Sequence, residues 1–455
     1  MLISGASIAG PALAYWLARY GYRPTVVELA PALRGGGFAV DFRGEAHLTV
    51  LHRMGLLDKL KQHRTDGAPM TFIDAQGRQV AALPLEFAAG DMEILRSDLS
   101  QLLYAHTHTQ TTPTEYLFGD SLTSLTETTD GVHATFERAA PRAFDLVVGA
   151  DGLHSTVRRL AFGPESPFVS HLGYYVAGWD LPTSAAPDLA ARAVGYNEPG
   201  RLITVGRVPR RASEASYNGE TFCVFASDPL TYDRRDPHSS RKAIAQAYEG
   251  AGWRTTELIE TLWNTDDLYF DSLSRVDVPT WSTGRVALLG DAAYGATVGG
   301  MGTGSALVGA YVLAGELALA AGDHRQAFAR YEQQLRPYVT RCQEGGRTTG
   351  TFLAPPTEEA LTARNATLNN PTALTTMLQA AHQASAAIPL LNYPTLLNTP
   401  TSHPQQQKPH PRKAPPSPQP AIDALAVHPR GERTRAVARH TSTARRTPEA
   451  THHGA

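Results

Sequence analysis

Hydrophobic residues near the N-terminus form two short runs on either side of a segment with helical periodicity. Residues 2–4 and 25–28 read LIS and TVVE and predict buried strands, and residues 9–20 place apolar side chains at helical spacing. Gly21 is expected to end this helix, because glycine is favoured just past a helix C-terminus. The pattern predicts a strand, a helix and a second strand with short connections, which is the βαβ unit of a parallel sheet.

The middle of the chain is dominated by the shorter period of β-strands. Residues 69–85 alternate in polarity about a turn at Asp74–Gly77, which predicts a hairpin. The segment from Arg96 to about His106 instead predicts a helix, with Ser97 as its N-cap. From about residue 166 to residue 275 most segments have strand character, so a second, sheet-rich domain is expected there.

Buried strand patterns return after the sheet-rich region. Residues 285–291 (RVALLGD) predict a buried strand, and a long helix of small residues is expected from about Gly304 to Ala321. The first domain is therefore expected to be discontinuous, with the second inserted into it. The first domain comprises residues 1–68, 92–165 and 272–354, and the inserted domain comprises residues 69–91 and 166–271. Residues 355–395 are expected to form a C-terminal helical segment, and residues 396–455 a disordered tail.

The tail follows a change in composition. Beyond Tyr393 the chain is rich in Pro, Thr, His, Gln and Arg and has little apolar periodicity, so it cannot bury enough surface to offset the entropy of ordering it. The tail is locally basic. A nucleic-acid-binding tail and an extension without function are both consistent with this, and we favour the second.

Composition excludes several classes of protein. Hydrophobic residues make up 42%, charged residues 18%, and the net charge is -2, so neither nucleic acid nor an anionic membrane is favoured as a partner. The two cysteines, Cys223 and Cys342, form no CxxC motif, so a disulfide framework or zinc site is not expected and a cytoplasmic location fits. No apolar run approaches the roughly 20 residues that span a bilayer, and no basic start of a signal peptide is present.

Three glycine-containing motifs carry the candidate chemistry, and the first is GASIAG at residues 5–10. Gly5 and Gly10 allow a tight turn and close approach of a pyrophosphate, and the following helix N-terminus supplies N–H donors. Ser7 stands where the second glycine of the usual pattern is found. Glu28 closes the next strand, where its carboxylate can accept hydrogen bonds from ribose hydroxyls. The motif predicts a dinucleotide site; the alternative is a tight turn and an ordinary strand-end glutamate.

The second motif, GADGLHSTVR at residues 149–158, joins a buried strand to a helix through Asp151-Gly152. The residues alone fit two interpretations equally well. One is a ligand site, and the other is a strand-to-helix turn with Asp151 as a cap.

The third motif, Gly290-Asp291, ends another buried strand and is followed by the Gly-rich residues 298–304. A strand-end aspartate can hydrogen-bond a ribose or another polyol, and the glycines let the backbone approach a ligand at a helix N-terminus. The alternative is a flexible loop beside a glycine-packed helix.

The order and separation of the three motifs resemble those of the FAD-dependent aromatic hydroxylases, the para-hydroxybenzoate hydroxylase-like flavin monooxygenases. The resemblance covers roughly residues 1–355. It implies an α/β fold, with a Rossmann-like FAD-binding domain and an inserted sheet-rich substrate domain. Residues 36–44 (GGFAVDFRG) and 310–317 (AYVLAGEL) look closest to bacterial antibiotic-modifying and polyketide-tailoring members, including tetracycline-inactivating enzymes.

The resemblance implies roles for particular residues. The first motif and Glu28 would bind the ADP half of FAD, the second motif would serve FAD and NAD(P)H, and Asp291 would contact the ribityl–pyrophosphate part. Ser155 and Arg158 stand at matching positions of the second motif. The expected cofactor-binding residues are Gly5, Ser7, Gly10, Glu28, Arg43, Arg96, Asp151, Gly152, Asp291, Gly300 and Gly302, and no metal site is expected.

The implied reaction is hydroxylation of an aromatic or polyketide-type small molecule with NADPH or NADH and O2, through a C4a-hydroperoxyflavin. No catalytic residue is assigned, because the family has no single acid–base residue. The substrate, the choice between NADPH and NADH and the oligomeric state stay open. Two alternative reactions on the same fold, a Baeyer–Villiger oxygenation and a dehydrogenation, also stay open. A flavin-binding protein without turnover also stays open, because the loop after Asp291 lacks the proline common there.

Further candidates are weaker. His47, His52, His154 and Tyr294 could serve in the site, and Tyr174, Tyr175 and Trp179 could form a wall of the substrate pocket. For all of these, and for Cys223 in a strand, a structural role is the favoured interpretation.

Overall fold

The structure is a computed structural model, and residues 1–400 form one compact unit. It describes residues 1–35, 38–65, 69–84, 90–181, 193–207, 219–234, 236–265, 268–296, 298–299, 301–385 and 388–398. Gly300 and most of the expected tail, from residue 399 onward, lie outside the described residues.

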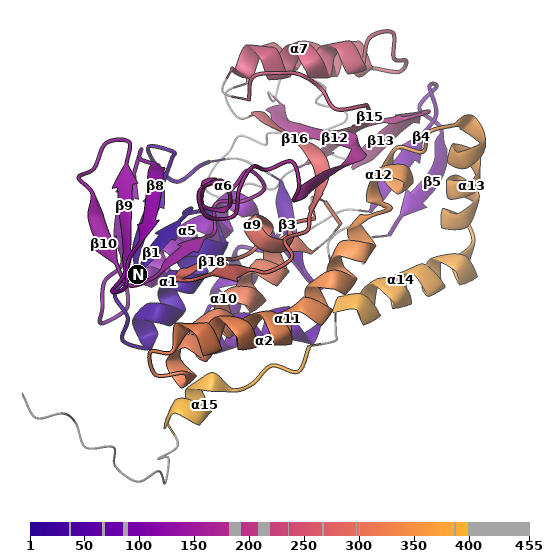
Figure 1. Cartoon of the computed structure of the whole chain (residues 1–455). Helices are drawn as coiled ribbons and strands as arrows, with labels where there is room; N and C mark the ends of the chain where they lie inside the picture. Colours follow the sequence, from indigo (N-terminus) through magenta and orange to yellow (C-terminus); the bar gives the residue numbers. More distant parts are fainter. Residues whose placement is uncertain are drawn as a thin grey trace, which may run out of the picture. The chain divides into compact units, whose positions relative to one another are not determined.

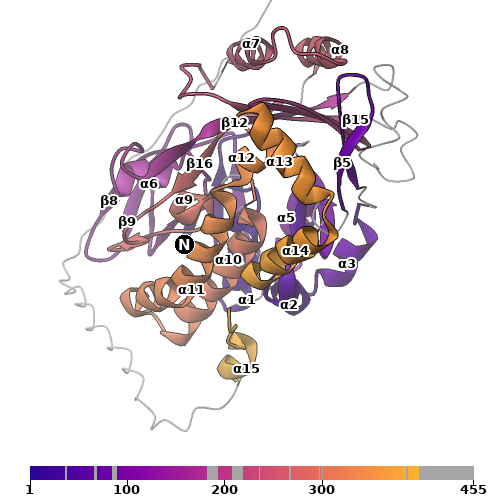
Figure 2. The same cartoon turned by 90° about the vertical axis from the view of Figure 1, so that its right-hand side faces the viewer.

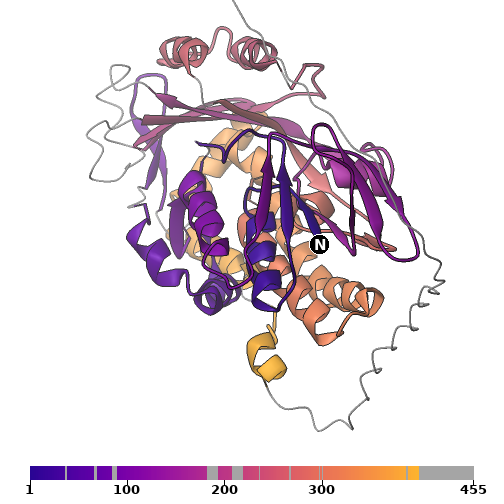
Figure 3. The same ribbon diagram turned by 90° about the vertical axis from the view of Figure 1, so that its left-hand side faces the viewer.

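A six-stranded sheet holds the N-terminal strand near its centre (Figures 1 and 3). Its order is β17-β18-β11-β1-β2-β7, and all neighbours are parallel except β17 and β18. The strands are β1 (Leu2–Ser4), β2 (Thr25–Glu28), β7 (Glu115–Phe118), β11 (Val147–Gly149), β17 (Ser282–Thr283) and β18 (Val286–Leu288). Widely separated parts of the chain thus meet in one sheet, as a discontinuous domain requires. The domain boundaries themselves stay a prediction.

Helices cover this sheet because its short apolar strands are buried on both faces. The predicted first helix, α1 (Ala9–Arg19), packs against α10 (Gly302–Leu319) and α5 (Arg96–Thr107). α10 in turn contacts α2 (Gly44–Met54) and α11 (His324–Gly346). Among the described helices α10 is the one long and apolar enough to cross a membrane, but 78% of it is buried inside the protein. That burial is expected of a core helix of small residues.

A second, seven-stranded sheet has the order β16-β12-β15-β14-β13-β4-β5, antiparallel throughout except between β13 and β4. Its strands are β4 (Met70–Ile73), β5 (Gln79–Leu83), β12 (Val169–Leu181), β13 (Val194–Glu198), β14 (Arg201–Arg207), β15 (Gly219–Ala226) and β16 (Leu268–Val276). The hairpin predicted at Asp74–Gly77 is confirmed, since the Gly77 N–H donates to the Asp74 carbonyl at 2.9 Å.

The two faces of this sheet are covered by different elements (Figure 2). Helices α7 (Pro237–Ala247) and α8 (Thr255–Thr261) lie on the outer face, away from the six-stranded sheet (Figures 1 and 2). On the inner face, α12 (Thr349–Leu353) and α13 (Glu358–Leu368) contact the strands. Because side chains alternate along a strand, Tyr174 and Val176 of β12 belong to the inner core, while Tyr175, Ala177 and Trp179 belong to the outer core.

The remaining elements join these layers. Two small antiparallel sheets pair β8 (Leu122–Glu127), β9 (Val132–Phe136) and β10 (Arg142–Phe144), and β3 (Ala39–Phe42) with β6 (Met92–Leu95). The other helices are α3 (Leu57–Gln62), α6 (Thr156–Ala161), the single turn η1 (Leu262–Asn264), α9 (Asp291–Tyr294), α14 (Pro371–Ser385) and α15 (Tyr393–Asn398). The N-cap expected at Ser97 is wrong by two positions. α5 begins at Arg96, directly after the extended Leu95, so Ser97 lies inside its first turn.

The helix α15 begins within the predicted C-terminal helical segment and continues to Asn398, three residues into the predicted tail. Tyr393 is fully buried, and its ring lies against Gly315 of α10, where a Cβ would come within 2.3 Å of the ring. The Tyr393 hydroxyl donates to Glu316 Oε1 at 2.7 Å. A single aromatic anchor of this kind produces no periodic pattern, which is why periodicity does not detect it.

We predict that Tyr393→Ala lowers the free energy of unfolding by about 3–5 kcal/mol, the usual cost of removing a buried aromatic side chain. Urea denaturation followed by circular dichroism measures this change. Leu397→Ala on the same helix is the matched control, because Leu397 is 36% exposed and should cost little. Equal effects of the two substitutions would show that α15 is not docked through Tyr393.

Candidate functional site

The turn between β1 and α1 leaves no room for side chains at either glycine of the first motif. Gly5 has φ +104°, and a Cβ there would lie 2.4 Å from the Ala150 carbonyl oxygen. A Cβ at Gly10 would lie 1.9 Å from the Gly5 carbonyl oxygen. No side chain caps the start of α1, and its first turn holds no acidic residue. The N-terminus of this helix is therefore suited to a phosphate anion.

Glu28 is held across the mouth of this turn. Its carboxylate accepts hydrogen bonds from the Ala6 N–H at 2.8 Å and from the Ala30 N–H at 3.0 Å. Each carboxylate oxygen can accept further bonds. Glu28 is thus fixed in the position where it could receive ribose hydroxyls.

Arg96 and Ser7 are brought together from separate parts of the sequence. Arg96 Nη2 donates to Ser7 Oγ at 3.0 Å, and Ser100 Oγ donates to the Ser7 carbonyl at 3.1 Å. The serine at the middle glycine position therefore has partners on α5. The Arg96 N–H also donates to the Phe38 carbonyl at 3.2 Å, so the same residue reaches the segment before β3.

Asp151 links the second motif to the first. Its carboxylate accepts bonds from Ser155 Oγ at 2.5 Å, from Ser4 Oγ at 3.1 Å and from the Val157 N–H at 3.1 Å. Burial raises the pKa of this carboxyl against the effect of these hydrogen bonds. The N-cap of α6 is Ser155, whose hydroxyl accepts the Arg158 N–H at 2.9 Å, and Asp151 supports this cap by accepting from Ser155 and from the Val157 N–H. Direct contact with a ligand stays a prediction for Asp151 and Gly152.

The buried Arg158 links the second motif to the third. Its guanidinium is inaccessible to solvent and donates to the Leu153 carbonyl at 2.6 Å and to the Ala292 carbonyl at 3.0 Å. It also pairs with Glu165 at 3.3 Å. Because Ala292 directly follows Asp291, this side chain fixes the two loops against each other.

Asp291 begins α9 after Gly290, whose φ is +64°. The Asp291 side chain retains accessible surface, yet the surrounding protein desolvates it and raises the pKa of its carboxyl, with Arg96 opposing the shift. A Cβ at Gly302 would lie 3.2 Å from Asp291 Oδ1. The glycine at the start of α10 therefore lets this helix begin close to the Asp291 carboxylate.

His47 packs against the N-terminal end of α10. Its Nδ1 accepts the Arg43 N–H at 3.1 Å, which assigns the proton to Nε2, 2.6 Å from the Tyr338 hydroxyl. A Cβ at Gly304 would lie 2.1 Å from the His47 ring, so the helix passes directly over the imidazole. Burial lowers the pKa of His47 to about 4, and the ring is neutral at neutral pH. The Arg43 side chain pairs with Asp41.

His154 joins the second motif to the seven-stranded sheet. Its Nδ1 lies 3.0 Å from both carboxylate oxygens of Glu165, and its Nε2 lies 3.2 Å from Asp271 Oδ1 on β16. Burial acts to lower the pKa of His154, but the contacts with Asp271 and Glu165 outweigh it, so the pKa is raised. This histidine is a polar link between the two sheets.

Several candidates from the sequence lie away from this site. Tyr175 and Trp179 belong to the outer core of the sheet, where Trp179 Nε1 donates to Thr261 Oγ1 on α8 at 2.8 Å. Tyr174 lies in the inner core against Gly350 of α12. Tyr294 is buried beside Tyr331, His52 is exposed on α2, and both cysteines are buried and free. The structural interpretation of these residues is supported.

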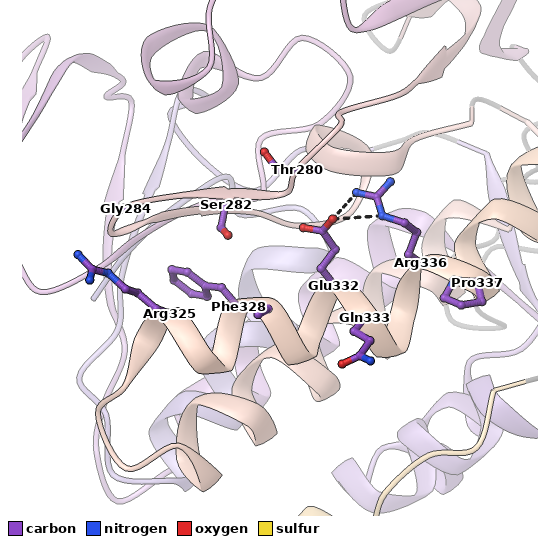
Figure 4. Close-up of a pocket in the computed structure, with 10 residues that line it drawn as sticks. Thr280, Ser282, Gly284, Arg325, Phe328, Glu332, Gln333, Arg336 and Pro337 are labelled. Atoms are coloured by element: carbon purple, nitrogen blue, oxygen red, sulfur yellow. Dashed lines mark hydrogen bonds and ion pairs between the residues drawn. The ribbon is translucent and has the colours of Figure 1, made fainter.

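Two cavities found in the described part of the chain also lie elsewhere. Figure 4 shows the first, a groove of about 690 Å³ between α11 and the β17 region. Glu332 in this groove is paired with Arg336, and Phe328 contributes an apolar wall. The second, of about 650 Å³, lies between β14–β15 and α7. Neither groove is lined by a predicted site residue.

The described residues fit FAD. A glycine turn, an uncapped helix N-terminus and a strand-end glutamate suit its ADP half, and the exposed Asp291 at the start of α9 suits its polyol chain. The sequence did not single out Tyr269 or Asp271 on β16, which the fold brings near Phe38 of the segment 36–44 and near Asp291. The pairing of β16 with β12 places Tyr269 and Asp271 there, and no local motif marks these two residues.

The fold and site define an FAD-binding oxidoreductase, and comparisons with known proteins agree. The FAD binding domain family matches residues 1–344. The uncharacterized protein Rv1260 of Mycobacterium tuberculosis is 41% identical over 350 residues, covering 75% of this chain and 91% of that protein. A flavin-dependent monooxygenase from an unknown prokaryotic organism is 35% identical over 388 residues, covering 84% and 97%. The crystal structure of tetracycline destructase Tet(51) matches with a TM-score of 0.72 at 31% identity, covering 86% and 98%.

The chain therefore belongs to the FAD binding domain family, and its relatives identify it as an FAD-dependent monooxygenase. The expected fold class, the FAD cofactor and the monooxygenase class are thereby confirmed. The individual site residues stay predictions.

The two histidines give opposite pH dependences of stability. The folded pKa of His47 is below its ordinary value, so its stabilising effect is present above about pH 6.5 and is lost as pH falls toward 4. That loss is on the order of 3 kcal/mol. The folded pKa of His154 is above its ordinary value, so its contribution is present below about pH 6.5 and is lost as pH rises through the folded pKa.

We predict that His47→Asn removes most of the decrease in the free energy of unfolding between about pH 6.5 and pH 4. His154→Asn should remove part of the decrease that occurs as the pH rises above about 6.5. Urea titrations at several pH values measure both slopes. The exposed His52→Asn on α2 is the control and should leave the profile unchanged. Identical profiles for all three variants would contradict the assigned environments.

Proposed function

We propose that this protein hydroxylates a planar aromatic or polyketide-type small molecule, using FAD, NADPH or NADH, and O2. The observation that carries the proposal is the position of Arg96. It donates to Ser7 in the first motif, and its charge acts on Asp291 in the third. One side chain thereby acts on a residue of the first motif and on a residue of the third. A relative of similar fold, Tet(51), is named a tetracycline destructase, which supports a polycyclic substrate.

The proposed roles follow the geometry. Gly5, Gly10 and the α1 N-terminus would receive the pyrophosphate, and Glu28 the adenosine ribose. Asp291 would contact the ribityl chain, with Gly302 letting α10 begin close to this carboxylate. Ser7, Arg43, Arg96, Asp151, Gly152 and Gly300 complete the proposed cofactor-binding set.

Bound FAD would supply the redox chemistry that no protein side chain offers. The protein would bind and orient the cofactor, hold the substrate and exclude water. The inner face of the seven-stranded sheet would close the site opposite the three motifs, since ligand sites commonly form between such layers. Asp151 and Arg158 would keep the loops rigid through buried hydrogen bonds rather than take part in proton transfer. A cytoplasmic location and the two-domain division given above belong to the same proposal.

We predict that the purified protein shows a flavin absorption spectrum and that Asp291→Ala reduces FAD affinity by about tenfold or more, since hydrogen bonds involving a charged group contribute roughly 1.5–3 kcal/mol. Titration of the apoprotein with FAD, followed by flavin fluorescence, measures the affinity. Asp277→Ala is the control, because Asp277 is exposed and pairs with Arg275. A wild-type protein without bound flavin would refute the proposed cofactor site.

We further predict that phenolic substrates stimulate NADPH or NADH oxidation and that one atom of labelled O2 enters the product as a hydroxyl group. Mass spectrometry of the product distinguishes this outcome from the two enzymatic alternatives. Baeyer–Villiger oxygenation would place the label in a ring ester, and dehydrogenation would incorporate no label. Oxidation that no aromatic compound stimulates would argue against the proposed reaction.

A further inference from the structure

The turn that follows α9 joins the third motif to the end of strand β16. The carbonyl of Gly295, the first residue after α9, accepts the Val276 N–H at 2.8 Å. Ala296 forms an isolated antiparallel bridge with Arg275. The turn also packs directly against Asp291, since a Cβ at Gly295 would lie 3.0 Å from both Cα and Cβ of that aspartate. The position of the turn therefore determines where Asp291 stands.

The backbone beyond this turn is strained. Val298 has φ +55° and Met301 has φ +53°, and they are two of the four non-glycine residues with positive φ in the described part of the chain. A β-branched residue such as valine is especially rare in this region. Such strain persists only where the surrounding structure over-determines it. The segment between α9 and α10 therefore needs firm attachment on both sides. On the α10 side, the Met301 carbonyl accepts the Ser305 N–H at 2.9 Å.

Gln343 of α11 supplies attachment on the α9 side. Its side chain is buried, its Nε2 donates to the Val276 carbonyl at 2.7 Å, and the same nitrogen lies 3.4 Å from the Gly295 carbonyl. Carbonyl oxygens only accept hydrogen bonds, so the NH2 group of the amide, with its two donors, must face this pair. One side chain thus ties the end of β16 to the turn after α9.

The surroundings of Gln343 show that its amide does more than fill space. The buried face of α11 is otherwise mainly apolar or aromatic, as at Phe328, Leu335 and Val339. A buried amide is costly unless it is hydrogen-bonded, whereas a methionine of similar shape would fill the position without that cost. The donors of Gln343 are spent on backbone carbonyls of two other segments, so their effect is to fix those segments relative to each other.

A second amide on the same helix provides a contrast. Gln334 Nε2 donates to Glu316 Oε1, and its Oε1 accepts the Tyr393 hydroxyl at 3.2 Å. Both partners lie toward the C-terminal end of α10 and outside the three motifs. Gln334 therefore offers the chemistry of Gln343 without contact with the cofactor-binding residues.

We propose that Gln343 is a positioning residue for the cofactor site. By holding Gly295 against the end of β16, its amide fixes the Asp291 carboxylate and the strained segment that leads to α10. This inference rests on the proposed function, in which Asp291 contacts the ribityl chain of FAD. Gln343 acts through the backbone and takes no part in proton or electron transfer.

The test begins with Gln343→Met in the full-length protein, since methionine keeps the unbranched shape and removes both donors. Titration of the apoprotein with FAD, followed by flavin fluorescence, should show a dissociation constant raised about three- to tenfold, because binding must then also order the turn. The visible absorption spectrum of the bound flavin should differ from that of the wild type, because its polar surroundings are displaced.

Hydrogen exchange supplies a readout that needs no cofactor. In the apoprotein, peptides spanning residues 292–305 should exchange at least threefold faster in Gln343→Met than in the wild type, since the turn has lost an anchor. Mass spectrometry of proteolytic fragments measures this rate. Peptides from strands β8 to β10 serve as the internal reference and should be unchanged.

Gln334→Met is the matched control. It should lower the free energy of unfolding, yet leave the exchange of residues 292–305, the FAD affinity and the flavin spectrum unchanged. Gly295→Ala provides a second approach, because the added Cβ presses on Asp291 while the donors of Gln343 are kept. It should weaken FAD binding as Gln343→Met does.

Failure of the positioning role and failure of the proposed function give different results. Absence of flavin from the wild-type protein would refute the cofactor site itself. A wild type that binds flavin, with a Gln343→Met variant that matches it in exchange, FAD affinity and spectrum, would overturn the positioning role and leave FAD binding intact. Equal changes in Gln334→Met and Gln343→Met would overturn it as well, because the effect would then be one of general stability.

Discussion

The register of three parallel strands is the constraint on which the site depends. Ser4 of β1 pairs with Gly149 of β11, and Gly149 pairs with Leu288 of β18, so these strands end at the same level of the sheet. Each of the three motifs begins at, or within two residues of, one of these strand ends. A shift of one residue in either pairing would separate the glycine turn from the loops that Asp151 and Asp291 begin. In open parallel sheets ligands bind outside the carboxyl ends of the strands, and here the register alone assembles that edge from three distant segments.

Buried polar contacts then make the assembled edge rigid. Asp151 joins β1 to α6, Arg158 joins the second loop to the third, and His154 joins the second loop to β16. A buried charge is costly unless it is paired and hydrogen-bonded, so these groups restrain the loops only in the one arrangement that satisfies them. They connect all three motifs and the opposite sheet without occupying the space where a cofactor would lie. The polar residues of the site thus divide into those that fix the loops and those, such as Asp291 and Glu28, that keep acceptor capacity for a ligand.

Sequence reasoning found the local parts of this arrangement and missed those that depend on long-range pairing. The β1–α1–β2 unit, the helix from Gly302 and the Asp74–Gly77 hairpin each carry their own periodicity and turn residues, so they could be predicted. Asp151 was ambiguous because a cap and a ligand residue have the same local sequence. Tyr174, Tyr175 and Trp179 lie on one strand, and only knowledge of which elements cover each face separates them. Tyr393 lies in the predicted C-terminal helical segment, but its role as a buried anchor could not be predicted, since its partner Glu316 lies in a different element.

Ser7 illustrates how a departure from a motif can be accommodated elsewhere in the fold. Glycine is usual at the middle position because the backbone there must approach a pyrophosphate closely. A serine keeps a small side chain and adds a hydroxyl, and in this protein the hydroxyl accepts a bond from Arg96. The same guanidinium acts on Asp291, and the backbone of Arg96 holds Phe38 in place. Through this one arginine the serine of the first motif is therefore linked to Phe38 by hydrogen bonds and to Asp291 of the third motif electrostatically. The serine of the first motif and the arginine that begins α5 therefore have to be considered together, because the hydrogen bond between them joins two segments that no local sequence pattern connects.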